Sequence, residues 1–82
     1  MYELIDKIAL NPKMIKDIRN PHPLLQKAAV RIRGDMIQYI INPTEEVQLL
    51  AVAQDWFNIY YIRNPTPAVY NASLGIKWAS PL

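Results

Sequence analysis

The sequence predicts an all-α protein, built as a short helical-repeat solenoid, and two repeating patterns carry this prediction. An Ile-x-x-Ile-x-Asn-Pro pattern occupies residues 15–21, 37–43 and 59–65, at a constant spacing of 22 residues. A second matching stretch follows each copy, at residues 25–30, 47–52 and 69–74. A fixed period of this size indicates a stack of small units, each of which buries its apolar face only against its neighbours.

The 82 residues predict one domain, residues 1–82. We expect about three units of two helices each, at residues 15–36, 37–58 and 59–82. Residues 1–14 resemble a unit whose Asn-Pro start has been trimmed, so we expect them to form an N-terminal cap. The C-terminal unit is also truncated, because it begins a last helix and stops before a further Asn-Pro.

The central unit shows the expected helices most clearly. Its first helix is predicted from about Pro43 to Gln54, with Val47, Leu50 and Ala51 on one buried stripe. Its second, shorter helix is predicted over about residues 57–63 and ends before the next Asn-Pro, because the residue before Pro is disfavoured in the helical region. Two helices per unit give a HEAT-like arrangement.

Several polar or small residues of the repeats are given structural roles. We expect Asn20, Asn42 and Asn64 to cap the first helices, although a row of amides that reads a periodic ligand is the alternative. Gln26 and Gln48 share one repeat position. We expect them to form hydrogen bonds between neighbouring units, with contact to a partner as the alternative. Gly34 is expected to end the first helix of its unit.

The inventory of side chains argues against catalysis. There is no Cys and only one His, His22, so a Cys/His metal site or a nucleophile and base pair is not predicted. The chain has two glycines and no Gly-rich phosphate loop. We attribute Glu45 and Glu46 to the positive end of a helix. We therefore expect no enzyme activity, no catalytic residue, no metal and no cofactor.

Composition also bears on location. The longest apolar runs are too short for a membrane span, and the N-terminus lacks the basic start of a secretory signal. We expect a soluble cytoplasmic protein that does not enter membranes.

Basic charge gathers in the first half of the chain. Residues 1–36 carry seven Lys/Arg and four Asp/Glu, a net charge of +3, whereas residues 37–82 carry a net charge of −1. A basic patch is predicted from Lys13, Lys16, Arg19, Lys27, Arg31 and Arg33. This patch is suited to phosphates, to an acidic protein surface, or to water alone.

Aromatic residues gather in the second half. We expect Trp56, Phe57 and Trp78 to fill the core. Tyr39 and Tyr61 share a repeat position that holds Asp17 in the first copy, so that position should be exposed. Exposed Tyr and Arg residues are typical anchors of protein interfaces. The predicted partner-binding residues are Tyr39, Tyr60, Tyr61 and Arg63.

The pattern Asn-Pro, Val-Gln-x-x-Ala-Val and Asp of residues 42–55 resembles the tandem repeats of an uncharacterised bacterial and phage family, which is classed as a domain of unknown function. The resemblance extends over about residues 15–74. It implies a helical-repeat fold, a bacterial or phage source, and no catalytic residue. A phage source would place the protein in the host cytoplasm.

These observations favour a non-catalytic protein–protein interaction module. Given the resemblance, the specific hypothesis is a small phage-encoded inhibitor or modulator of a host protein complex, such as a defence system. A nucleic-acid-binding protein that uses the basic patch is the first alternative. The second is a structural homo-oligomer, including a homo-dimer through an apolar C-terminal end formed by Ile76, Trp78 and Leu82.

Overall fold

The computed structural model describes residues 2–79, and within that range every regular element is a helix. The α-helices are α1 (Tyr2–Leu10), α2 (Pro23–Ile32), α3 (Glu45–Gln54) and α4 (Pro67–Ala79). Three 3₁₀-helices alternate with them: η1 (Pro12–Asp17), η2 (Gly34–Tyr39) and η3 (Trp56–Tyr61). The all-α prediction is therefore confirmed.

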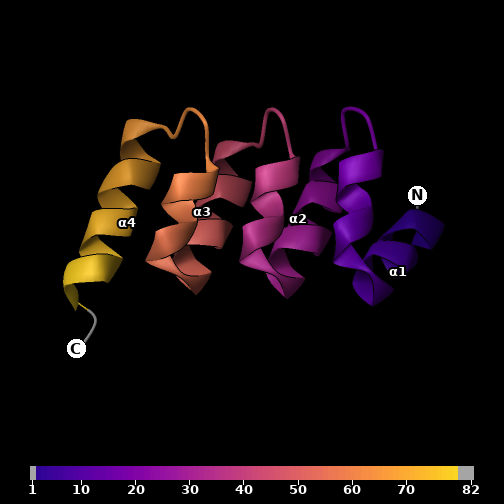
Figure 1. Cartoon of the computed structure of the whole chain (residues 1–82), viewed down its shortest axis with the longest axis horizontal. Helices are drawn as coiled ribbons and strands as arrows, with labels where there is room; N and C mark the ends of the chain where they lie inside the picture. Colours follow the sequence, from indigo (N-terminus) through magenta and orange to yellow (C-terminus); the bar gives the residue numbers. More distant parts are fainter. Residues whose placement is uncertain (1, 80–82) are drawn as a thin grey trace.

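The elements follow one another in space in the order of the sequence. Among the described residues, the contacts between α-helices join only consecutive α-helices, and the contacts between 3₁₀-helices join only consecutive 3₁₀-helices. The two kinds of helix form two rows along the longest axis, which is 39 Å long. The three Asn-Pro segments lie together along one edge, at the top of Figure 1.

The core is a thin layer between the two rows. The α-helices supply it with small and β-branched residues at matching repeat positions, such as Val47, Ala51 and Val52 in α3. The 3₁₀-helices supply isoleucines, of which Ile15 and Ile37 are almost fully buried. Because protein cores are close-packed, side chains of this small to medium size match the short distance between the two rows of helices.

The second helix of each repeat is a 3₁₀-helix, and geometry explains this. An α-helix of ten residues is about 15 Å long at 1.5 Å per residue. The six residues of the return helix extend to about 12 Å at the 3₁₀ rise of 2.0 Å per residue, but only to about 9 Å as an α-helix. The 3₁₀ form therefore lets a short segment return along most of its neighbour.

The predicted role of Asn20, Asn42 and Asn64 as helix caps is wrong. The caps lie two residues later: the Thr44 hydroxyl accepts a hydrogen bond from the Val47 amide at 3.2 Å. In the other repeats the Thr66 hydroxyl accepts from the Val69 amide at 3.3 Å, and His22 Nδ1 accepts from the Leu24 amide at 3.1 Å.

In the outer repeats a second proline stands at the position where the helix begins, and the central helix begins at the same position, where it has Glu45. Pro23 and Pro67 are the first residues of α2 and α4, where a missing amide hydrogen costs nothing, so the residue before each of them is the cap. Asn20 instead adopts a left-handed conformation with φ 53°, which Asn tolerates better than most residues.

The predicted hydrogen bonds of Gln26 and Gln48 across neighbouring repeats are confirmed. Gln26 donates to the Pro21 carbonyl at 3.0 Å and accepts from the Thr44 amide at 3.2 Å. Gln48 repeats this bridge one repeat later, between Pro43 and Thr66. Each buried carboxamide thus joins two consecutive Asn-Pro segments. Tyr70 takes this position in the third copy, where it is half exposed.

Gly34 does not end α2, as the sequence suggested; it is the first residue of η2 and it is buried. Its amide donates to Gln54 Oε1 at 2.7 Å. A Cβ atom on Gly34 would lie 2.5 Å from Asn58 Nδ2 and 2.9 Å from Gln54 Oε1. Both amides are held by other bonds, since Asn58 Nδ2 donates to the Ala51 carbonyl. Close approach, and not helix termination, requires glycine here.

We expect Gly34→Ala to lower the free energy of unfolding by about 1–3 kcal/mol, because the new methyl group must displace a buried, hydrogen-bonded amide. Gly75 is the matched control. It lies inside α4 with open space around its Cβ position, so Gly75→Ala should stabilise the protein by about 0.5–1 kcal/mol. Urea unfolding followed by circular dichroism measures both, and equal effects of the two substitutions would contradict the close-approach explanation.

Thr44→Ala should cost about 1 kcal/mol of stability, because the Val47 amide loses the hydroxyl that caps it. Asn42→Ala should leave the stability nearly unchanged, since the Asn42 side chain is exposed and forms no hydrogen bond with a described residue. Thermal unfolding of the two variants decides between the two caps. A larger loss for Asn42→Ala would restore the Asn residues as caps.

Candidate binding surface

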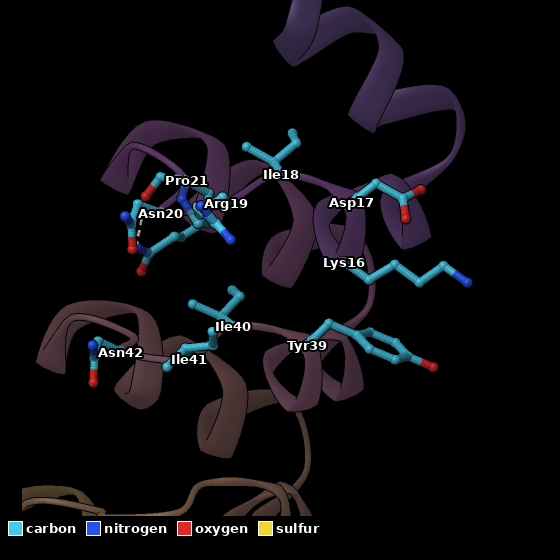
Figure 2. Close-up of a pocket in the computed structure, with 11 residues that line it drawn as sticks. Lys16, Asp17, Ile18, Arg19, Asn20, Pro21, Tyr39, Ile40, Ile41 and Asn42 are labelled. Atoms are coloured by element: carbon cyan, nitrogen blue, oxygen red, sulfur yellow. Dashed lines mark hydrogen bonds between the residues drawn. The ribbon is translucent and has the colours of Figure 1, made fainter.

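A hollow of about 410 Å³ opens between the first two Asn-Pro segments. It is lined by residues 16–21 on one side and residues 39–42 on the other, with Gln26 at its base. Lys16 and Tyr39 extend in the same direction at one end, and Asn20 and Asn42 lie at the other end (Figure 2).

The next pair of Asn-Pro segments forms the same feature again. Two smaller hollows, of about 70 and 100 Å³, lie between residues 38–43 and residues 61–64. Taken together, their lining residues are those of the first hollow moved on by 22 positions, residue for residue. We call the two stretches together the loop groove, with a first segment lined by residues 16–21 and 39–42 and a second segment lined by residues 38–43 and 61–64; residues 39–42 lie between the two segments and line both.

The two segments differ in volume because their side chains differ. Where the first segment has Asp17, the second has Tyr39, whose ring is much larger and fills part of the space. The groove is therefore open and partly charged at the N-terminal segment. It is narrower and more aromatic at the second segment.

The structure divides the predicted basic patch. Lys27 forms an ion pair with Glu46 at 2.7 Å, and Arg33 forms one with Asp35 at 2.9 Å. Lys13 and Arg31 are exposed away from the groove. The remaining two residues, Lys16 and Arg19, line the first segment and form no ion pair with a carboxylate among residues 2–79.

Three of the four predicted partner-binding residues line one hollow of the second segment: Tyr39, Tyr61 and Arg63. Tyr61 is 40% exposed and Arg63 is exposed. Tyr60 is 66% exposed, but it faces a different hollow, next to α4. Tyr39 also lines the first segment, together with Lys16 and Arg19. Part of the predicted basic patch and part of the predicted tyrosine set therefore share the loop groove.

Tyr39 is less exposed than expected, since it is half-buried and packs against the core. In an α-helix it would lie about 160° around the axis from the buried Ile37. A 3₁₀-helix turns about 120° per residue, so Tyr39 lies only about 120° from Ile37, in line with the buried Met36. The expectation that this position stands clear of the apolar face was wrong because the helix type was wrong.

The prediction that Trp56, Phe57 and Trp78 fill the core is also wrong. Trp56 is half-buried, Phe57 is 49% exposed and Trp78 is 78% exposed. Trp56 is the first residue of η3 and Trp78 lies in the last turn of α4, so both stand at the ends of their elements and outside the buried positions of those helices.

The exposed rings form a cluster beside α4. Phe57 and Tyr60 pack edge to face with ring centroids 4.9 Å apart, and Trp56 joins them. Lys77 Nζ lies 4.9 Å from the centre of the Trp56 ring. Next to this cluster, Ile59, Tyr70 and Leu74 help to line an apolar hollow of about 290 Å³.

The predicted C-terminal contact surface is only partly visible. Ile76 is half-buried, Trp78 is highly exposed, and Leu82 lies outside the described residues.

No helix among residues 2–79 is both long enough and apolar enough to cross a bilayer. Within the same residues, no three His, Cys, Asp or Glu side chains gather closely enough to hold a metal ion.

Ile41 is the residue that sequence reasoning missed. It is 74% exposed and lines both segments of the loop groove. The signal was present, because Ile41 shares its repeat position with Arg19 and Arg63. An apolar residue at a position that is otherwise cationic is expected to be exposed.

No protein-family model, no curated protein and no solved structure matches this chain.

Proposed function

We propose that this chain is a helical-repeat solenoid that binds another protein without catalysis, and that the loop groove and its rim of tyrosines form the binding surface. The observation that carries the proposal is the single hollow lined by Tyr39, Tyr61 and Arg63. Tyr and Arg are enriched among residues that dominate protein interfaces. The strictly sequential contacts of the helices support the solenoid.

The arrangement of charge favours a protein over a nucleic acid as partner. Two of the six residues of the basic patch are neutralised by Glu46 and Asp35, and the whole chain has a net charge of only +2. Strong binding to phosphates requires several unpaired cations on one face. On the resemblance expected for residues 42–55, we further propose a host protein complex as the target and inhibition or modulation as the effect.

Tyr61→Ala should weaken binding of the partner by about thirtyfold, the equivalent of the roughly 2 kcal/mol that a truncated interface anchor costs. The partner is first captured from bacterial lysate with the intact chain, and its affinity for each variant is then measured by calorimetry. Because Tyr61 is 40% exposed, the fold should persist, which circular dichroism checks.

Leu10→Ala is the matched control. Leu10 is 89% exposed at the end of α1 and lines none of the hollows described above, so its removal should leave the affinity unchanged. Equal affinities of Tyr61→Ala and the intact chain would contradict the proposed surface. Tight, strongly salt-dependent binding of an oligonucleotide in place of a protein would show the nucleic-acid alternative.

A further inference from the structure

We infer that the loop groove holds an extended segment of the partner protein with an acidic residue, an apolar residue and a second acidic residue, each three positions after the last. This inference rests on the proposed function and names the ligand of the same surface. It follows from three features of the loop groove. They are its period, the side chains at the repeat position of Arg19, and the carboxamides at the repeat position of Asn20.

The period of the groove selects an extended ligand. Packed helices lie about 8–10 Å apart, which sets the distance from one segment of the groove to the next. In polyproline II conformation three residues extend about 9 Å and complete one turn, so every third side chain returns to the same face. An α-helical ligand covers that distance in about six residues, after which its side chains have turned by about 240° and face away.

One column of side chains sets the chemistry of the ligand. Arg19, Ile41 and Arg63 occupy the same repeat position, are exposed, and line the groove in that order. Neither arginine forms an ion pair with a described carboxylate. A ligand in register therefore meets a guanidinium, an apolar side chain and a second guanidinium. Complementary groups are an acid, an apolar residue and an acid.

The asparagines supply contacts that are independent of ligand sequence. Asn20, Asn42 and Asn64 line the groove, are exposed, and form no hydrogen bond with other described residues. The caps of α2, α3 and α4 are other residues, so these carboxamides are not engaged in capping the helices. Each carboxamide has a donor and an acceptor, as does a peptide group, and the row repeats with the period of the groove.

The same column argues against a single-stranded nucleic acid in this groove. A phosphate backbone presents a negative charge at every nucleotide and binds best to a continuous row of cations. Ile41 stands at the central step, where it offers an apolar surface with no charge. An extended polypeptide meets all three positions with ordinary side chains.

The test is the binding of labelled peptides to the full chain, followed by fluorescence anisotropy. The first probe is a peptide of nine Pro and Ser positions in which Asp replaces positions 2 and 8 and Leu replaces position 5. The second probe has the same composition, with its two Asp residues four positions apart instead of six. We expect the second to bind at least about tenfold more weakly, because only one arginine is then engaged.

Charge exchange tests the register. The Arg19→Glu, Arg63→Glu double variant should lose binding of the acidic peptide by about tenfold or more and should bind a matching peptide that carries Lys at positions 2 and 8. The control is Lys13→Glu with Arg31→Glu, which has the same net charge but changes residues outside the groove. It should retain most of the binding to the acidic peptide.

Four results would overturn the inference. Equal affinity for the two Asp spacings, or an equal loss in the control variant, would show attraction by net charge alone. The third is tighter binding of oligothymidylate than of any peptide, and the fourth is failure of both peptides to bind. If the peptides fail while Tyr61→Ala still loses the captured partner, the proposed function stands and only the extended ligand is wrong.

Discussion

The bridge formed by each buried glutamine is the interaction on which the loop groove depends. Gln26 and Gln48 each bind the backbone of their own Asn-Pro segment and the backbone of the next. A buried carboxamide without partners is costly, so these bonds favour one spacing between the segments. The groove lies between segments that are held in this way, at the spacing that the packing of the helices sets.

Much of the fold could be predicted from the period of the sequence. The 22-residue spacing, the buried stripe of Val47 and Ala51, and the bridging role of Gln48 all follow from the repetition of residue types. The caps and the type of the second helix could not be read from the period, since both depend on local competition. Thr44, and not Asn42, caps α3 because α3 begins at Glu45. The short return segment adopts the 3₁₀ form because of the length that it must span.

The candidate site was predicted less well than the fold, and the reasons are physical. The tyrosines were placed by α-helical geometry, which misjudged Tyr39 by about 40° around its helix. Lys16 and Arg19 were grouped with cations elsewhere in the sequence, whereas the structure sets them beside Tyr39 of the next repeat. Such neighbours are 20 or more positions apart in the chain, and their contact exists only once the repeats are stacked.

Tyr70 bears on which part of the chain can be duplicated to add further repeats. Tyr70 stands at the repeat position of Gln26 and Gln48, and a phenol has no separate donor and acceptor atoms with which to form the same two-bond bridge. Residues 37–58 contain both partners of the glutamine bridge. The Thr44 amide donates to Gln26 of the repeat before, and Gln48 accepts from the Thr66 amide of the repeat after. A tandem duplication of those residues would therefore preserve the glutamine bridge between all neighbouring copies. Evolution could therefore lengthen the groove in whole 22-residue steps by copying the middle of the gene, while the third copy would end such a series.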